Sequence, residues 1–207
     1  PARRAALRQP FHVWTLGAGG LFGYHFCYFT ALDNAPAVDA SLIAYLWPLF
    51  IVLGSALMPG ERLRWHHVAG ALLGLSGATL IVTKGGAVNF EAKYAFGYAM
   101  AGLCALIWSS YSLLSRRNAA VPTDTVTGFC VLTAMLGLAA HLIFEETVWP
   151  QAGGEWSAII LLGFVPLGLA FMAWDYGVKH GDIQVLGAAS YASPLLSTLV
   201  LIATGRA

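Results

Sequence analysis

Two short stretches of the chain decide its fold: Ala44-Tyr45-Leu46-Trp47-Pro48-Leu49-Phe50 and Ser190-Tyr191-Ala192-Ser193-Pro194-Leu195-Leu196. Each lies near the centre of an apolar run about long enough to cross a bilayer. A proline in mid-helix removes one hydrogen bond and clashes with the carbonyl four residues back, here that of Ala44 or Ser190. Because an unpaired carbonyl is costly in lipid, we expect both breaks to face protein or a water-filled cavity, where water or a ligand satisfies these carbonyls.

The two stretches belong to an internal repeat. They are offset by 146 residues, and the same offset places Tyr28-Phe29-Thr30-Ala31-Leu32 on Trp174-Asp175-Tyr176-Gly177-Val178. Matching broken segments in corresponding halves of a chain are typical of transporters and indicate the substrate site.

Composition identifies the class of protein. Charged residues are 10% of the chain, against about 25% in a soluble domain, and hydrophobic residues are 58%. We therefore expect a multi-pass protein of the lipid bilayer. A net charge of +1 without a basic run gives no indication of a nucleic-acid partner. Cys27, Cys104 and Cys130 lie inside apolar runs, where an odd number of thiols indicates helix packing rather than disulfides or a zinc site.

About seven apolar runs are long enough to span a bilayer. Alternate connections, beginning with the segment before the first run, hold eight Lys and Arg residues. The intervening connections hold two, with Arg206 beyond the last run as a third, so the positive-inside rule places the richer set in the cytoplasm. The predicted runs are 12–32, 38–58, 66–83, 94–115, 125–144, 156–176 and 183–204.

The repeat sets the expected architecture. The first run matches the sixth and the second matches the seventh, and a shift by an odd number of helices gives the two copies opposite orientations in the membrane. We expect an all-α, polytopic membrane helix bundle with an inverted repeat, of which this chain holds about seven of ten helices. Residues 1–93 would be the first repeat without its first two helices, and residues 94–207 the second repeat without its last helix.

Polar and aromatic side chains near the middle of the runs are the candidate site. His25 lies close to the centre of the first run, where an ionisable residue is by default a functional hypothesis, although a neighbouring carbonyl could also satisfy it. Trp108, Tyr111, Ser112 and Ser115 form one helix face, which could line a cavity or pack between helices with hydroxyls bonded to backbone. The candidate substrate-binding residues are Tyr24, His25, Tyr28, Tyr45, Trp47, Pro48, Trp108, Tyr111, Ser190, Tyr191 and Pro194.

Asp175 is a carboxylate inside the sixth apolar run. It lies four residues before Lys179, which favours an ion pair on the helix surface, and a role in proton coupling is the alternative. No catalytic constellation, metal-binding pair or glycine-rich phosphate loop is present in the sequence, so we expect neither an enzyme nor a cofactor.

The sequence resembles the EamA family of the drug/metabolite transporter superfamily, and most of all its YddG-type exporters of aromatic amino acids. The resemblance rests on Tyr24-His25-Phe26-Cys27-Tyr28, on Tyr45-Leu46-Trp47-Pro48, on Gly60-Glu61 after the second run and on Ser190-Tyr191-Ala192-Ser193-Pro194. The second copy departs from the family pattern, with Gly205-Arg206 in place of Gly-Glu.

This resemblance implies ten helices, an inverted five-helix repeat with a central cavity, and export of amino acids and related metabolites across the bacterial inner membrane. We expect a secondary transporter that works by alternating access, favours aromatic amino acids and acts as a monomer. The alternatives are an exporter of drugs or other metabolites and, in different classes, a membrane-embedded enzyme or a structural subunit.

Overall fold

The computed structural model describes residue 6, residues 8–87 and residues 89–205, so Arg3, Arg4 and Arg206 of the charge argument lie outside it. The described residues form helices and connecting turns, without a strand. The long helices are α2 (Phe11–Asn34), α5 (Trp65–Val82), α6 (Ala95–Arg117) and α7 (Thr125–Phe144); the shorter ones are α3 (Ala37–Ala44), α4 (Trp47–Gly54), α8 (Gly153–Phe164), α9 (Ala170–His180), α10 (Ile183–Ala189) and α11 (Ser193–Ala203), with the single turns η1 (Ser55–Leu57), η2 (Ala92–Tyr94) and η4 (Ser190–Ala192) and the π-helical η3 (Val165–Leu169).

Within the described part of the chain, six helical segments are long and apolar enough to cross a membrane, and they coincide with six of the seven predicted runs. The remaining run is also a helix, α2, of 24 residues, but it does not reach the same apolarity, because glycines and the polar rings of Tyr24, His25 and Tyr28 interrupt it. The six segments are Ala37–Leu57, Trp65–Val82, Ala92–Arg117, Thr125–Phe144, Gly153–His180 and Ile183–Ala203.

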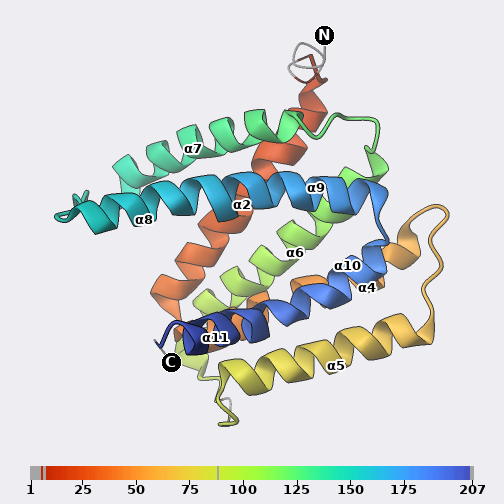
Figure 1. Ribbon diagram of the computed structural model, residues 1–207, viewed down its shortest axis with the longest axis horizontal. Helices are drawn as coiled ribbons and strands as arrows, with labels where there is room; N and C mark the ends of the chain where they lie inside the picture. Colours follow the sequence, from red (N-terminus) through yellow and green to blue (C-terminus); the bar gives the residue numbers. More distant parts are fainter. Residues whose placement is uncertain (1–5, 7, 88, 206–207) are drawn as a thin grey trace. The chain divides into compact units, whose positions relative to one another are not determined.

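The chain forms two compact units, and α2 and α6 contribute to both. The first unit comprises residues up to Gly23 and Leu114–Gly181, and the second comprises Tyr24–Leu113 and the residues from Asp182 onward. Figure 1 labels the helices of each unit.

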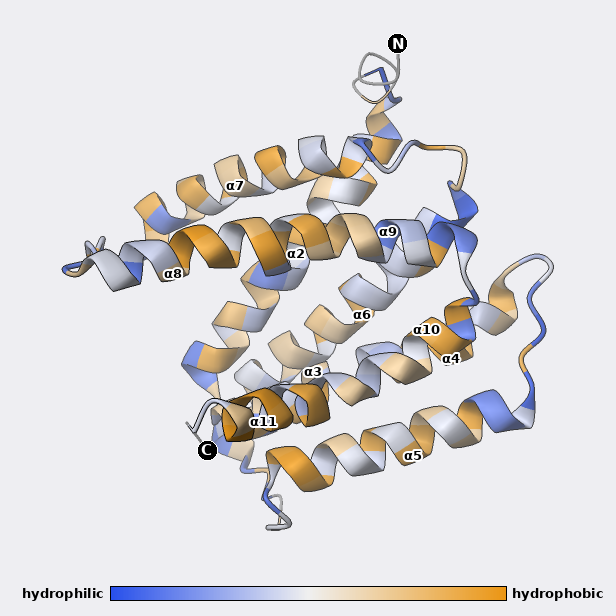
Figure 2. Cartoon of the chain, viewed as in Figure 1, coloured by the Kyte–Doolittle hydropathy of each residue, from blue (hydrophilic) through white to orange (hydrophobic). Residues whose placement is uncertain are grey.

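In the first unit, α7 packs beside α9 and η3 (Figure 1). Gly128 of α7 lies under the Trp14 indole of α2, where an added Cβ would be 2.6 Å from the ring, and Trp14 meets Phe129 edge-on at 5.5 Å. The apolar residues of α8 are coloured orange in Figure 2, and the most apolar window of Gly153–His180 has none of its residues buried. This surface matches what a lipid-facing helix requires, because lipid solvates apolar side chains.

Asp175 and Lys179 form a buried ion pair in the first unit rather than the expected surface pair. Lys179 Nζ lies 2.7 Å from Asp175 Oδ2, with side-chain exposures of 2% and 0%. Ser115 and Thr123 donate to the two carboxylate oxygens at 2.9 and 2.8 Å. Burial follows because the end of α6 and the connection to α7 cover α9, which a pattern along one helix does not reveal.

In the second unit, α10 packs against α4 and α5. Cys27, Ala44 and Cys104 form a buried cluster, which confirms the prediction that these thiols pack between helices. The chain turns after the first broken helix at Gly60, whose φ of +83° suits a glycine because it lacks a Cβ.

Candidate functional site

Both predicted helix breaks are present, at equivalent positions of the two copies. The first broken helix stops at Ala44 and resumes at Trp47, and the second stops at Ala189 and resumes at Ser193 after one 3₁₀ turn. In each case the new helix begins at the residue before the proline, whose missing N–H costs nothing in the first turn of a helix. Pro48 and Pro194 are both buried.

At the second break, the freed Ser190 carbonyl finds a hydrogen-bond donor within the same segment. The Ser193 N–H donates to the Ser190 carbonyl, because the chain tightens into a 3₁₀ turn and brings these groups together. The Ser190 hydroxyl donates to the Leu186 carbonyl at 2.8 Å. The prediction that the Ser190 carbonyl needs water or a ligand is therefore wrong.

The first break is filled by a side chain of the second copy. The Leu49 N–H donates to the Tyr191 hydroxyl at 3.2 Å, and that hydroxyl donates to the Tyr45 carbonyl at 3.0 Å. In an unbroken α-helix the Leu49 N–H would donate directly to the Tyr45 carbonyl, four residues earlier. The Tyr191 hydroxyl is thus inserted into the backbone hydrogen-bond ladder, one of the known physical causes of a helix kink.

Close packing brings Tyr191 to this position. An added Cβ on Gly74 of α5 would lie 2.7 Å from Tyr191 Cδ2, so only glycine leaves room for the ring there. A Cβ on Gly187 of α10 would lie 3.2 Å from the Pro48 carbonyl oxygen, so α10 and α4 approach each other through a glycine.

Polar contacts at the two ends of α4 and α10 show in which direction these helices run relative to each other. Gln184, at the start of α10, donates to the Ser55 hydroxyl just beyond the end of α4 at 3.1 Å. Tyr191, after the end of α10, contacts Tyr45 before the start of α4. The two segments therefore run antiparallel, in agreement with their course in Figure 1.

Five predicted site residues form one aromatic cluster in the second unit, with Trp108 at its centre. The centroid of the Trp108 ring lies 5.1 Å from the ring centroid of Tyr24, 6.3 Å from that of Trp47 and 5.4 Å from that of Tyr111. Tyr24 stacks on Tyr28 at 6.1 Å. Trp108 and Tyr111 are buried, whereas the other three are half-buried. The cluster therefore offers partly exposed ring faces on a buried base.

The remaining predicted residues lie around this cluster or at the breaks. His25 meets Tyr24 edge-on at 5.1 Å, and Tyr45 packs with Tyr191 in a neighbouring apolar cluster. Ser112, from the predicted polar stripe of α6, donates to the Trp108 carbonyl at 2.9 Å. Ser112 therefore fits the second interpretation of this stripe, in which the hydroxyls bond to backbone and the residues pack between helices.

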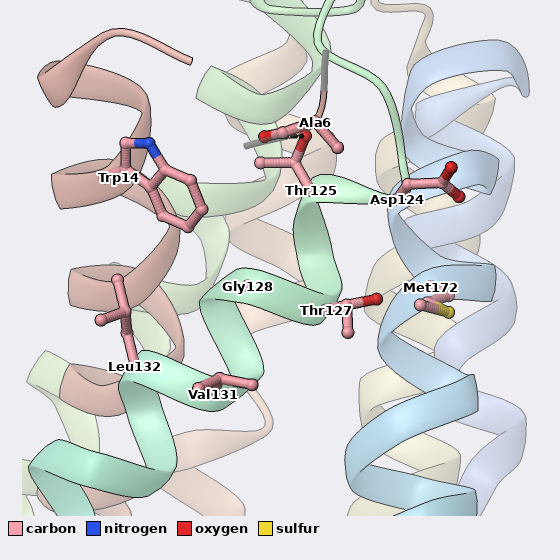
Figure 3. Close-up of a pocket in the computed structure, with 9 residues that line it drawn as sticks. All are labelled: Ala6, Trp14, Asp124, Thr125, Thr127, Gly128, Val131, Leu132 and Met172. Carbon is pink, nitrogen blue, oxygen red and sulfur yellow. Dashed lines mark hydrogen bonds between the residues drawn. The ribbon is translucent and has the colours of Figure 1, made fainter. Parts of the chain in front are cut away.

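The first unit contains a cavity of about 840 Å³. Figure 3 shows Trp14 and Leu132 on one side of it and Met172 on the other, with Thr127 between them. Its walls are mainly apolar, and none of its lining residues belongs to the predicted set. No sequence signal indicated it, because its walls come from helices distant in the chain. The lining residues are Ala6, Trp14, Asp124, Thr125, Thr127, Gly128, Val131, Leu132 and Met172.

A further feature missed by the sequence analysis is the π-helix η3, which divides the span Gly153–His180. Pro166 within this run was the available signal. The Leu167 carbonyl of η3 accepts the Cys130 thiol of α7 at 3.6 Å. Among the described residues, no group of three or more His, Cys, Asp or Glu is arranged to hold a metal ion.

Known proteins identify the molecule's family. The model of the EamA-like transporter family matches residues 5–83 and 95–204. The chain belongs to this family. It is 54% identical over 204 residues to the aromatic amino acid exporter YddG of Ancylobacter novellus. The aligned region covers 98% of this chain and 71% of that protein. EamA membership makes the chain part of a polytopic membrane transporter rather than an enzyme, as the sequence predicted.

Two further comparisons agree with this assignment. YddG of Salmonella typhimurium is 27% identical over 205 residues, covering 92% of this chain and 68% of that protein. A crystal structure of a protein 55% identical in sequence matches with a TM-score of 0.94, over 98% of this chain and 70% of that one. The EamA membership predicted from the sequence resemblance is therefore confirmed.

Proposed function

We propose that this EamA transporter exports aromatic amino acids across the bacterial inner membrane. The observation that carries the proposal is the aromatic cluster centred on Trp108, in a chain 54% identical to an aromatic amino acid exporter. The cluster lies beside the first helix break, where Trp47 begins α4. Its half-buried rings are suited to the flat, apolar ring of such a substrate.

The cluster can meet each part of such a substrate. Offset or edge-on contact between a substrate ring and Trp47 or a tyrosine contributes about 0.5–1.5 kcal/mol beyond burial. The ammonium group is attracted to an aromatic face. The imidazole of His25 and the tyrosine hydroxyls provide donors for the carboxylate. With no arginine in the proposed residue set, the carboxylate is held weakly, as an exporter that must release its substrate requires.

In this proposal the predicted site residues fall into two groups, those that contact the substrate and those that shape the helix breaks. Tyr24, His25, Tyr28, Trp47, Trp108 and Tyr111 contact the substrate, with Tyr45 and Pro48 beside them. Ser190, Tyr191 and Pro194 shape the two breaks beside this pathway. The Ser190 hydroxyl donates to the Leu186 carbonyl before the second break, and the Tyr191 hydroxyl donates to the Tyr45 carbonyl in the first.

We also propose that residues 1–93 and 94–207 belong to two inverted repeats that together provide alternating access, and that the protein acts as a monomer. The separate family matches at 5–83 and 95–204 support this division, since they leave a gap close to residue 93. The 146-residue spacing of the two breaks supports the repeat itself.

Uptake into proteoliposomes tests the function directly. Uptake of labelled tryptophan, phenylalanine and tyrosine should exceed uptake of aspartate, lysine and glycine, because only the first three have a ring that can pack against the aromatic cluster. Protein-free liposomes provide the background, and unlabelled tryptophan should compete with labelled phenylalanine. Equal uptake of all six amino acids would refute aromatic preference, and uptake at background would refute amino-acid transport.

A further inference from the structure

One hydrogen bond joins a residue to its own repeat counterpart. The Tyr191 hydroxyl donates to the Tyr45 carbonyl, and these two residues are separated by 146 positions, which is the offset of the repeat. The same offset relates Leu49 to Leu195 and Pro48 to Pro194. Each copy therefore carries the same three parts: a tyrosine hydroxyl, a tyrosine carbonyl and the N–H of a leucine after a proline.

The 146-residue offset maps α4 onto α11 and α3 onto α10, so a two-fold rotation that exchanges the copies turns the observed contact into a reciprocal one. In the observed contact, Tyr191 of the second copy fills the break of the first, between the Tyr45 carbonyl and the Leu49 N–H. In the equivalent contact, Tyr45 would fill the break of the second copy, between the Tyr191 carbonyl and the Leu195 N–H. That position is also a break in the structure, since α11 begins at Ser193.

The structure contains one of the two contacts. Tyr191 is 5% exposed and uses its hydroxyl twice. The half-buried Tyr45 has no hydrogen bond from its hydroxyl to any of the described residues. The two copies are thus chemically equivalent but conformationally different at their breaks.

Such a difference has a direct consequence in an inverted repeat. Because the copies have opposite orientations in the membrane, exchanging their conformations converts a site open to one side into a site open to the other. This step rests on the proposed transport by alternating access.

We propose that Tyr191 and Tyr45 are a reciprocal pair of positioning residues for transport. Tyr191 closes the first break in the conformation described here. In the conformation open to the opposite side, Tyr191 withdraws and Tyr45 closes the second break by bonding the Tyr191 carbonyl and the Leu195 N–H. Each tyrosine thereby stabilises one of the two states.

Tyr191→Phe and Tyr45→Phe test the pair, because each removes a single hydroxyl. Tyr191→Phe should depopulate the present state and Tyr45→Phe the other, by about two- to tenfold, as expected for a hydrogen bond of ordinary net strength. Since apparent affinity scales with the fraction of binding-competent protein, the KM measured on one membrane face should rise and that on the other should fall. The two variants should shift the ratio of these KM values in opposite directions, and the double variant should return it toward that of the unmodified protein.

Two controls separate this proposal from simpler roles. Tyr176→Phe removes the hydroxyl of a tyrosine that is 61% exposed and should leave both KM values unchanged. Loss of a substrate contact alone would raise KM on both faces, and a loss of packing would lower the amount of active protein without changing the ratio. A shift of the ratio in the same direction for Tyr191→Phe and Tyr45→Phe, or no shift for Tyr45→Phe, overturns the proposal.

Amide hydrogen exchange of the full-length protein in nanodiscs, measured without substrate, tests the tyrosine pair independently of the proposed function. Tyr191→Phe should speed exchange at Leu49 relative to the unmodified protein, whereas Tyr45→Phe should slow it, because more molecules then keep Tyr191 in the first break. Absence of aromatic amino-acid transport together with these opposite exchange changes would refute the substrate and leave the tyrosine pair standing. Unchanged exchange in both variants overturns the pair whatever the substrate.

Discussion

The buried ion pair of the first unit yields the sharpest stability prediction, through Asp175→Asn. The carboxylate of Asp175 accepts hydrogen bonds from Ser115, Thr123 and Lys179, and the Lys179 ammonium also donates to the Val121 carbonyl. An asparagine at this position removes the negative charge and leaves a buried ammonium without its counter-ion. Removing one partner of a buried pair costs about 3–5 kcal/mol.

This cost translates into a measurable change in thermal unfolding. For a protein of this size, 1 kcal/mol corresponds to about 2–4 °C in Tm, so Asp175→Asn should lower Tm by about 6–20 °C. Lys179→Met should have a comparable effect, since it leaves an uncompensated carboxylate. The double variant D175N/K179M removes both charges and should lose much less than the two single losses added together.

The assay is thermal unfolding of the purified full-length protein in detergent, followed by transport in proteoliposomes with and without a pH gradient. Single variants within about 4 °C of the unmodified protein, or a double variant whose loss is the sum of the two, would contradict the structural role. If D175N/K179M folds and still responds to a pH gradient as the unmodified protein does, proton coupling through Asp175 is excluded.

Two further substitutions, each with a control variant, test the second unit. Gly74→Ala places a Cβ 2.7 Å from the Tyr191 ring, so it should destabilise the protein by about 1–3 kcal/mol. Gly70→Ala, where no side chain or other segment lies within 4 Å of the added Cβ, should be neutral or stabilising, and equal Tm values for the two variants would argue against the close contact. His25→Ala should lower aromatic amino-acid transport with little change in Tm, whereas His66→Ala, at an exposed position, should change neither. Normal transport by an unstable His25→Ala protein would mean that His25 serves packing alone.

The sequence was sufficient to predict the spans and the breaks. The helices follow the apolar runs closely, because lipid offers no hydrogen-bond partner and a spanning segment must satisfy its backbone within itself. The breaks at Pro48 and Pro194 follow with equal directness, since each proline removes a donor from its own helix. The aromatic residues that form the cluster were also recognisable, because polar rings are unusual within apolar runs.

The groups that fill the breaks could not be predicted in the same way. The proline pattern predicted water or a ligand at the Ser190 carbonyl, whereas a local 3₁₀ turn supplies the Ser193 N–H. The i, i+4 spacing of Asp175 and Lys179 predicted an ion pair on a helix surface, whereas neighbouring segments bury it. Both errors concern the environment of a group whose position along the chain was identified correctly.

The positions of the membrane helices, the places where two of them break and the fixed offset between the breaks all follow from the order of residues along the chain. These properties depend on hydrophobicity, on backbone donors and on proline geometry, which act over a few neighbouring residues. Only the tertiary structure decided that Tyr191 fills the first break and that Gly74 makes room for it. Which side chain satisfies an open backbone group depends on the close packing of helices distant in sequence, and such packing is set by the fit of many side chains at once.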